Sequence, residues 1–298
     1  MALSQRTPFR QMARLYGAIL GVSQSLAVLA RKDGRDDLRQ TERELAEIKE
    51  ALHALAPVPP EVETEDVALH SLLGFRLLLD RKSLVDRHLI ATGEWEAEQF
   101  AYLAWLSERF RGMPHAVFVD IGAYWGLYSL VAHRSGVFNQ IIAFEADRHN
   151  HAQLQTNLLL NNALKAVRTV HKAVGATDGT LFMRDSTSHP DGNRGGVGVA
   201  REDEGLPGVH MDATTVDTAV PVKGSHILIK IDVEGFEAKV LRGMTDLVAN
   251  NKVVMQVEIF DIHMADAAVE IKRLGLRQIH CVHPDYYLTN MTVDELGI

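Results

Sequence analysis

The chain has 298 residues, 46% of them hydrophobic, which is enough to bury one sizeable core and to carry an appendage. Its formal net charge of -8 offers no general basic surface for phosphate groups, so we expect no nucleic-acid partner. The single cysteine, Cys281, cannot form an internal disulfide and lies in an apolar run. We therefore expect a buried thiol, a reducing environment and a cytoplasmic protein.

Residues 1–60 are predicted to form an N-terminal helical segment. Its first helix, Leu15–Ala30, has no charge, but glycines and polar residues interrupt it and it is too short to span a bilayer comfortably. We expect no transmembrane segment and no secretory signal; the helix packs on protein or, as the alternative, touches a membrane surface. The second helix, Asp36–Ala56, has apolar residues at heptad spacing. It either docks on its own domain or joins two copies of the chain through residues 36–56.

Residues 61–298 form the second predicted domain, which begins with an acidic stretch. The cluster Gly93–Glu96 reads Gly-Glu-Trp-Glu, and its acids suit the first turn of a helix because they interact favourably with the helix dipole. We expect the next helix to run from Phe100 to Phe110 and to lead the chain to the first strand of a sheet.

The stretch after this helix has the pattern of a strand, a glycine turn and a helix. Val117–Val119 is a β-prone apolar run, as expected in a parallel sheet covered on both faces, and Asp120 follows it. Gly122 and Gly126 permit a tight turn and a close approach of a ligand to the main chain. The unpaired N–H groups of the following helix point at the same space. The pattern fits a purely structural turn or a nucleotide-type pocket.

The next predicted strand, Gln140–Phe144, is followed by Glu145, about 25 residues after Asp120. A carboxylate at that position can accept hydrogen bonds from a ribose diol, which favours a cofactor with a nucleoside. An acid precedes the first glycine, and a carboxylate there would repel the pyrophosphate of a dinucleotide. The pattern therefore favours S-adenosylmethionine, which carries an ammonium and a sulfonium group, over an NAD-type cofactor.

Strands and helices continue to alternate as far as Val257, and a hairpin is predicted at the end. This alternation predicts an α/β fold with a doubly wound, mostly parallel sheet, a C-terminal β-hairpin and the N-terminal helical extension. The expected elements after Glu145 are a helix (151–164), strands (167–174 and 179–184), a Ser/Gly-rich loop (186–198), a strand (227–232) interrupted by Lys230, a helix from 233, a strand (253–258), a helix (265–274) and two strands (276–282 and 286–291).

Four acids follow or end predicted parallel strands: Asp120, Glu145, Asp232 and Glu258. Ligands in doubly wound sheets bind at the carboxyl ends of the strands, so these side chains are expected at one edge. Any one of them can be a helix cap. Four together cost electrostatic energy unless a cation or a hydroxyl-rich ligand compensates.

These motifs resemble the FkbM family of S-adenosylmethionine-dependent methyltransferases, over roughly residues 70–290. Residues 119–129 are similar to the first motif of that family and 144–146 to the second. The stretch 230–237, Lys-Ile-Asp-Val-Glu-Gly-Phe-Glu, with 240–243 after it, resembles the most distinctive signature. A shorter motif at 215–217, the cluster Gly93–Glu96, and Asn157 with Asn161 also fit.

The resemblance implies a class I, Rossmann-like methyltransferase in which Asp120, Gly122, Ala123 and Gly126 hold the methionine part of the cofactor. It implies that Glu145 holds the ribose, with Ala146 beside it. Tyr124 and Trp125 stand where the family usually has Asn-Ile-like residues, which implies a bulkier pocket wall.

Several members of the family methylate hydroxyl groups of sugars or polyketides, so the expected reaction is O-methylation of a glycan or a small metabolite. Asp232 and Glu258 are the candidates for shaping the acceptor site, with His263 as a lower-ranked base. No metal is assigned, although a divalent ion held by Asp232 and a neighbouring acid is an alternative way to acidify the hydroxyl. The competing interpretation is a non-catalytic, cofactor-binding scaffold that acts through its N-terminal helices.

Overall fold

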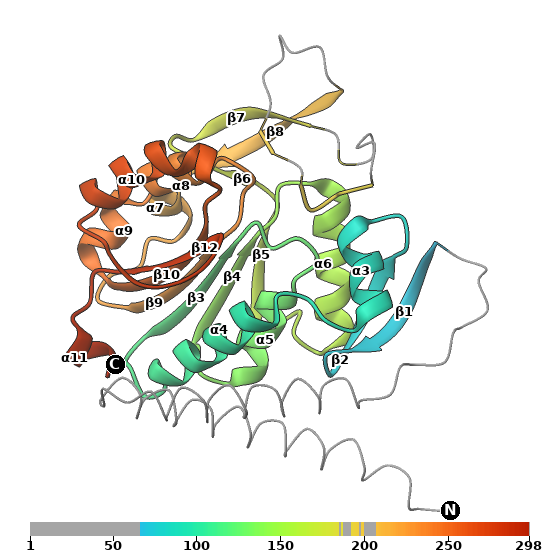
Figure 1. Ribbon diagram of the computed structural model, residues 1–298, viewed down its shortest axis with the longest axis horizontal. Coiled ribbons are helices and arrows are strands. Elements are labelled where there is room, and N and C mark those ends of the chain that lie inside the picture. The colour runs from blue at the N-terminus through green and yellow to red at the C-terminus, as the bar shows by residue number, and fades with distance from the viewer. Residues whose placement is uncertain (1–65, 185, 187–191, 197, 200–206, 298) are drawn as a thin grey trace, which may run out of the picture.

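The computed structural model describes residues 66–184, 186, 192–196, 198–199 and 207–297 (Figure 1). The two predicted N-terminal helices and the boundary near residue 60 lie outside the described residues. Within the described ranges, no helix is both long enough and apolar enough to cross a membrane.

A seven-stranded sheet forms the centre of the molecule, with the strand order β11-β12-β10-β9-β3-β4-β5. The five strands from β10 to β5 are parallel, and β12 pairs antiparallel with both β10 and β11. The prediction of a mostly parallel, doubly wound sheet with a C-terminal hairpin is therefore confirmed. The strands are β3 (Ala116–Ile121), β4 (Gln140–Phe144), β5 (Val167–Val170), β9 (His226–Ile231), β10 (Lys252–Glu258), β11 (Arg277–Val282) and β12 (Asp285–Thr289).

Helices cover both faces of this sheet, because successive strand residues point to opposite faces and both rows are apolar. Phe118 of β3 belongs to the core under α4, α5 and α6, whereas Val119 belongs to the core under α7, α8, α9 and α10. The helices are α4 (Ala97–Arg109), α5 (Leu127–Ser135), α6 (Arg148–Leu160), α7 (Val216–Ala219), α8 (Glu237–Arg242), α9 (Thr245–Asn250), the 3₁₀ turn Asp261–His263, α10 (Met264–Arg273) and α11 (Val293–Leu296).

A small unit precedes the sheet and stands at the right of Figure 1. It consists of the antiparallel pair β1 (Val67–Leu72) and β2 (Phe75–Asp80), followed by α3 (Leu84–Thr92). Two asparagines, one within α6 and one at its C-terminal cap, attach β2 to the main domain. Asn157 accepts a hydrogen bond from Leu78 N–H and donates one to the Trp125 carbonyl, and Asn161 bonds both backbone groups of Arg76.

A three-stranded sheet, β6-β8-β7, projects above the central sheet. Its strands are β6 (Ala173–Val174), β7 (Gly179–Arg184) and β8 (Gly208–Thr214). The prediction of a single strand over residues 167–174 is wrong. β5 ends at Val170, and the separate strand β6 pairs with β8 in the small sheet. No strand is predicted at β8, because four of its seven residues are polar or glycine and its pairing with β7 is long-range.

The prediction of a buried cysteine is also wrong. Cys281 is exposed, because it lies on β11, the edge strand of the central sheet, whose residues are largely open to solvent. The apolar run around it belongs to an edge strand that has only one neighbour.

The contacts of Asn157 predict a stability effect. Asn157→Ala leaves the Leu78 N–H and the Trp125 carbonyl without their partner in a buried place, so the free energy of unfolding should fall by about 2–4 kcal/mol in a denaturant titration. Thr156→Ala is the matched control on the exposed side of the same helix, with an expected change within about 0.5 kcal/mol. Equal effects of the two substitutions would contradict the attachment of β2 through Asn157.

Candidate cofactor and acceptor site

A cavity of about 280 Å³ opens at the carboxyl ends of β3, β4, β9 and β10. Six of the nine residues predicted for the site line it: Gly122, Ala123, Glu145, Ala146, Asp232 and Glu258. The other three, Asp120, Gly126 and His263, do not. The structure thus brings most of the predicted residues together and separates these three from the cavity wall.

The turn between β3 and α5 is shaped by two glycines with positive φ angles. A Cβ atom on Gly122, at φ +81°, would lie 1.7 Å from the carbonyl oxygen of Asp232, so only glycine allows β3 and β9 to end this close together. A Cβ on Gly126 would lie 2.4 Å from Leu154 Cδ1 of α6. Gly126 therefore serves helix packing, whereas Gly122 brings the turn against Asp232.

Asp120 lies beneath this turn and is 1% exposed. Its carboxyl accepts a hydrogen bond from the Ser129 hydroxyl at 2.6 Å. Burial raises the pKa of Asp120 to about 6, although the Ser129 hydrogen bond opposes the shift. This acid fixes the start of α5 to the end of β3 and has no place on the cavity surface.

Glu145, the predicted ribose ligand, lies on the cavity wall directly after β4. Its carboxylate oxygens accept backbone hydrogen bonds from Tyr124 at 2.7 Å and from Asp147 at 2.8 Å, which fix its orientation on the cavity wall. Burial raises the pKa of Glu145 to about 8 against the effect of these two amides. Because each carboxylate oxygen has more than one lone pair, both can still accept hydrogen bonds from a diol.

The opposite end of the cavity contains a buried ammonium group. Lys230 is 2% exposed, and its Nζ lies 3.2 Å from Asp285 Oδ1 and 3.5 Å from Asp232 Oδ2. It also lies 5.1 Å from the centre of the Tyr128 ring. Burial alone would lower the pKa of Lys230, but the carboxylates around it, Asp232 and Asp285 first, raise it well above its usual range. The lysine is therefore charged, and Asp232 is its partner at the cavity surface.

Three acids crowd this end. Asp232, Glu234 and Glu258 each offer one carboxylate oxygen, and these three oxygens lie within 4.8 Å of one another. Such an arrangement could hold a divalent cation. Burial, followed by the charge of Asp232, raises the pKa of Glu258 far above its usual range. This shift favours the protonated form of Glu258, which can donate a hydrogen bond, whereas Asp232 faces Lys230.

His263 lies behind the loop that follows β9. A Cβ on Gly235 would lie 2.7 Å from His263 Nε2, so the imidazole packs directly against the main chain there. The ring is not on the cavity wall.

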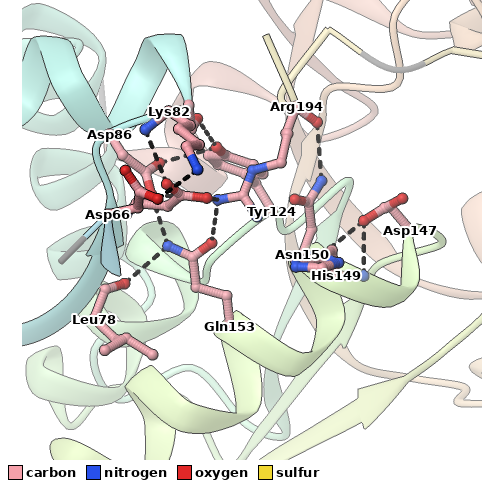
Figure 2. A network of polar contacts seen from close by, with 12 residues as sticks. Asp66, Leu78, Lys82, Asp86, Tyr124, Asp147, His149, Asn150, Gln153 and Arg194 are labelled. Carbon is pink, nitrogen blue, oxygen red and sulfur yellow. Dashed lines mark hydrogen bonds and ion pairs between the residues drawn. The ribbon is translucent and has the colours of Figure 1, made fainter. Parts of the chain in front are cut away.

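The far wall of the cavity includes Asn193–Gly196, held in place by the buried side chain of Arg194 (Figure 2). Its guanidinium lies 3.4 Å from Asp80 and 3.6 Å from Asp86 and donates to Gln153 at 3.0 Å. Asp86 also accepts from the Tyr124 hydroxyl at 2.9 Å. This network joins the small N-terminal unit, α6 and the turn after β3, and so fixes the wall relative to Glu145.

Sequence reasoning missed three of these residues. The sequence places Lys230 within an apolar strand and at the start of the signature 230–237 without assigning it a role, although a lysine within such a run is itself a signal of a buried, paired charge. Glu96, which lines the cavity, is predicted as a helix-entry acid in a cluster that fits the family, with no role of its own, and Arg194 lies in a predicted loop. Local patterns carry no information on which distant acids these residues meet.

The parallel sheet, with a cavity at the carboxyl ends of its strands, defines a Rossmann-like α/β domain. Residues 120–277 match the family model described as the Methyltransferase FkbM domain, which is more than half of the chain. The chain belongs to the FkbM methyltransferase family, and its cofactor is S-adenosylmethionine.

No curated protein matches the chain. Similar solved structures include a SAM-dependent methyltransferase from Agrobacterium tumefaciens, with 12% identity, 77% of this chain and 71% of that chain covered, and a TM-score of 0.43. TYW2 from M. jannaschii, in complex with AdoMet, has 12% identity, coverages of 77% and 86%, and a TM-score of 0.38. A precorrin-6y C5,15-methyltransferase from Geobacter metallireducens GS-15 has 15% identity, coverages of 63% and 85%, and a TM-score of 0.36.

The close approach of Gly122 to Asp232 predicts the effect of one methyl group. Gly122→Ala should destabilise the fold by about 1–3 kcal/mol more than Gly136→Ala does, because both glycines have positive φ angles but a Cβ on Gly136 meets nothing within 4 Å. Denaturant titrations of the two variants measure the difference. Equal losses would show that backbone conformation alone, and not the contact with Asp232, requires glycine at 122.

The raised pKa of Glu145 predicts a pH dependence of cofactor binding. Below pH 8 the free protein holds this carboxyl protonated, and a carboxylate is the stronger acceptor for ribose hydroxyls, so affinity for S-adenosylhomocysteine should rise by about tenfold from pH 6 to pH 9. The amino group of the ligand titrates in the same range. Calorimetry on Glu145→Gln supplies the comparison, and an identical pH profile in that variant would remove Glu145 from the effect.

Proposed function

We propose that the chain transfers the methyl group of S-adenosylmethionine to a hydroxyl group of a glycan or a small metabolite. The observation that carries this proposal is the Lys230–Asp232 pair, in which a carboxylate that is 28% exposed at its side chain faces the cavity beside a buried ammonium. The net charge of -8 supports an acceptor other than nucleic acid.

The cavity residues fit the cofactor at both ends. Gly122 and Ala123 would lie along the methionine part, and Glu145, with Ala146 beside it, would bind the ribose through its free acceptor positions. The acids at the end of β9 and β10 suit the positive charge of the sulfonium. When bound, the cofactor supplies an activated methyl group. Asp120 and Gly126 support this site from beneath the turn and through α6.

Asp232 is the proposed base. A hydroxyl that attacks a methyl group must lose its proton, and Asp232 can accept that proton at the cavity surface. Lys230 Nζ lies 3.5 Å from Asp232 Oδ2 and fixes the position of this carboxylate. The protonated form of Glu258 can donate a hydrogen bond to Asp232 or to the acceptor, which holds the acceptor oxygen in position. His263 ranks lower as a base because its ring packs against Gly235 away from the cavity.

Asp232→Asn tests this assignment. The variant should bind S-adenosylhomocysteine within a few-fold of the unaltered protein but transfer methyl groups about a hundredfold more slowly, because no carboxylate takes the proton. The acceptor would come from a screen of glycans and small hydroxylated metabolites, with initial rates measured for each variant. Asp261→Asn, an exposed acid after β10, is the matched control and should be fully active.

Full turnover by Asp232→Asn would contradict its role as base. Loss of activity of the unaltered protein in EDTA, restored by a divalent cation, would instead make Asp232, Glu234 and Glu258 metal ligands.

A further inference from the structure

Glu96 lies at the N-terminal end of α4 in a backbone conformation that residues other than glycine rarely adopt. Its backbone has φ 46° and ψ 46°, in the left-handed region. Such a conformation persists only where the surrounding structure enforces it, and it often occurs at ligand sites. Here Glu96 lines the cavity, together with Trp95 before it and Phe100 in the first turn of the helix.

The contacts of Glu96 orient its carboxylate without neutralising it. Glu96 Oε2 accepts a hydrogen bond from the Tyr128 hydroxyl at 2.6 Å, and Tyr128 lies in the first turn of α5, directly after the glycine turn. Among the residues that the structure describes, no Lys, Arg or His side chain comes within 4.0 Å of the Glu96 carboxylate as an ion pair. Burial raises the pKa of Glu96 above its ordinary value, and the charge of Lys230, which acts only through space, opposes that shift. The carboxylate is therefore oriented but lacks a cationic partner in contact.

This carboxylate belongs to the end of the cavity at which the methionine part of the cofactor would lie. It is bonded to Tyr128 next to the Gly122 turn, and its electrostatic neighbours are Lys230 and Asp232 at the end of β9. The ribose ligand Glu145 follows β4, which lies on the other side of β3 in the sheet. The ammonium group of the methionine part needs a carboxylate, and buried Asp120 is not available on the cavity surface.

We propose that Glu96 binds the α-ammonium group of S-adenosylmethionine. The inference rests on the proposed placement of the methionine part along Gly122, and it replaces Asp120 with Glu96 as the acid for that group. Tyr128 holds the carboxylate through one oxygen, which leaves the other for the ammonium. The left-handed backbone at Glu96 thus places its carboxyl group, from the start of α4, beside Tyr128 and the glycine turn.

The test compares two ligands that differ in the amino-acid end. S-adenosylhomocysteine carries the ammonium group, whereas 5′-methylthioadenosine has the same thioether and nucleoside without it. Calorimetry on the full chain at pH 7 should show that Glu96→Gln weakens binding of S-adenosylhomocysteine about tenfold, because a charge-assisted hydrogen bond is lost. Binding of 5′-methylthioadenosine should stay within about twofold, because an amide at residue 96 can still accept from Tyr128.

Glu98→Gln is the matched control, since it removes the same charge from an exposed position two residues along α4. It should change neither affinity. Glu96→Gln with unchanged binding of both ligands, or with equal weakening of both, would overturn the role of Glu96 because the effect would not depend on the ammonium group. Failure of the unaltered protein to bind either ligand would instead contradict the cofactor site itself.

Discussion

The buried ammonium group of Lys230 is the constraint on which the site depends. A charge that is 2% exposed in the middle strand of a sheet is tolerated only if opposite charges surround it. Asp285, from the start of β12, and Asp232, from the end of β9, meet this need. Gln256 donates to the same oxygen of Asp285 and thereby fixes its position. Removing one partner of such a buried charge typically lowers the free energy of unfolding by about 3–5 kcal/mol, so these residues act as one cooperative unit.

This constraint explains why the C-terminal hairpin belongs to the functional domain. Asp285 is the first residue of β12, and β12 pairs with β10 so that Asp285 lies opposite Glu258. The hairpin therefore brings the counter-charge for Lys230 to the end of the sheet at which the cavity opens. The hairpin at the edge of the sheet therefore supplies, through Asp285, one of the negative charges that balance Lys230.

The sheet register sets the boundary between core and site. Asp120 and Gln256 both pair with Lys230 on neighbouring strands, so three polar residues form a row across the centre of one face. Two residues earlier on the same strands, the corresponding row consists of Phe118, Leu228 and Val254. These apolar residues belong to the core under α4, α5 and α6. The core on this face thus ends at one level of the sheet, and ionisable side chains begin there.

Much of this architecture could be predicted from the sequence, because strand and helix periodicity and the glycine turn are local patterns. The parallel order, the hairpin and the presence of Glu145 and Asp232 at one cavity followed from those patterns. The location of Asp120 did not, because its bond to Ser129 turns a strand-end acid inward. The roles of Glu96 and Arg194 depend on contacts with residues far away in the chain, which periodicity cannot reveal.

A crystal structure with S-adenosylhomocysteine would test the central claim, that the cofactor spans the cavity from Glu145 to the charged cluster around Lys230. We expect the ribose hydroxyls on the Glu145 carboxylate and the sulfur on the side of the cavity that Asp232 lines. A ligand in the reverse orientation, with its sulfur beside Lys172 and its nucleoside beside Asp232, would contradict the placement of the methyl group and the assignment of Asp232 as the base.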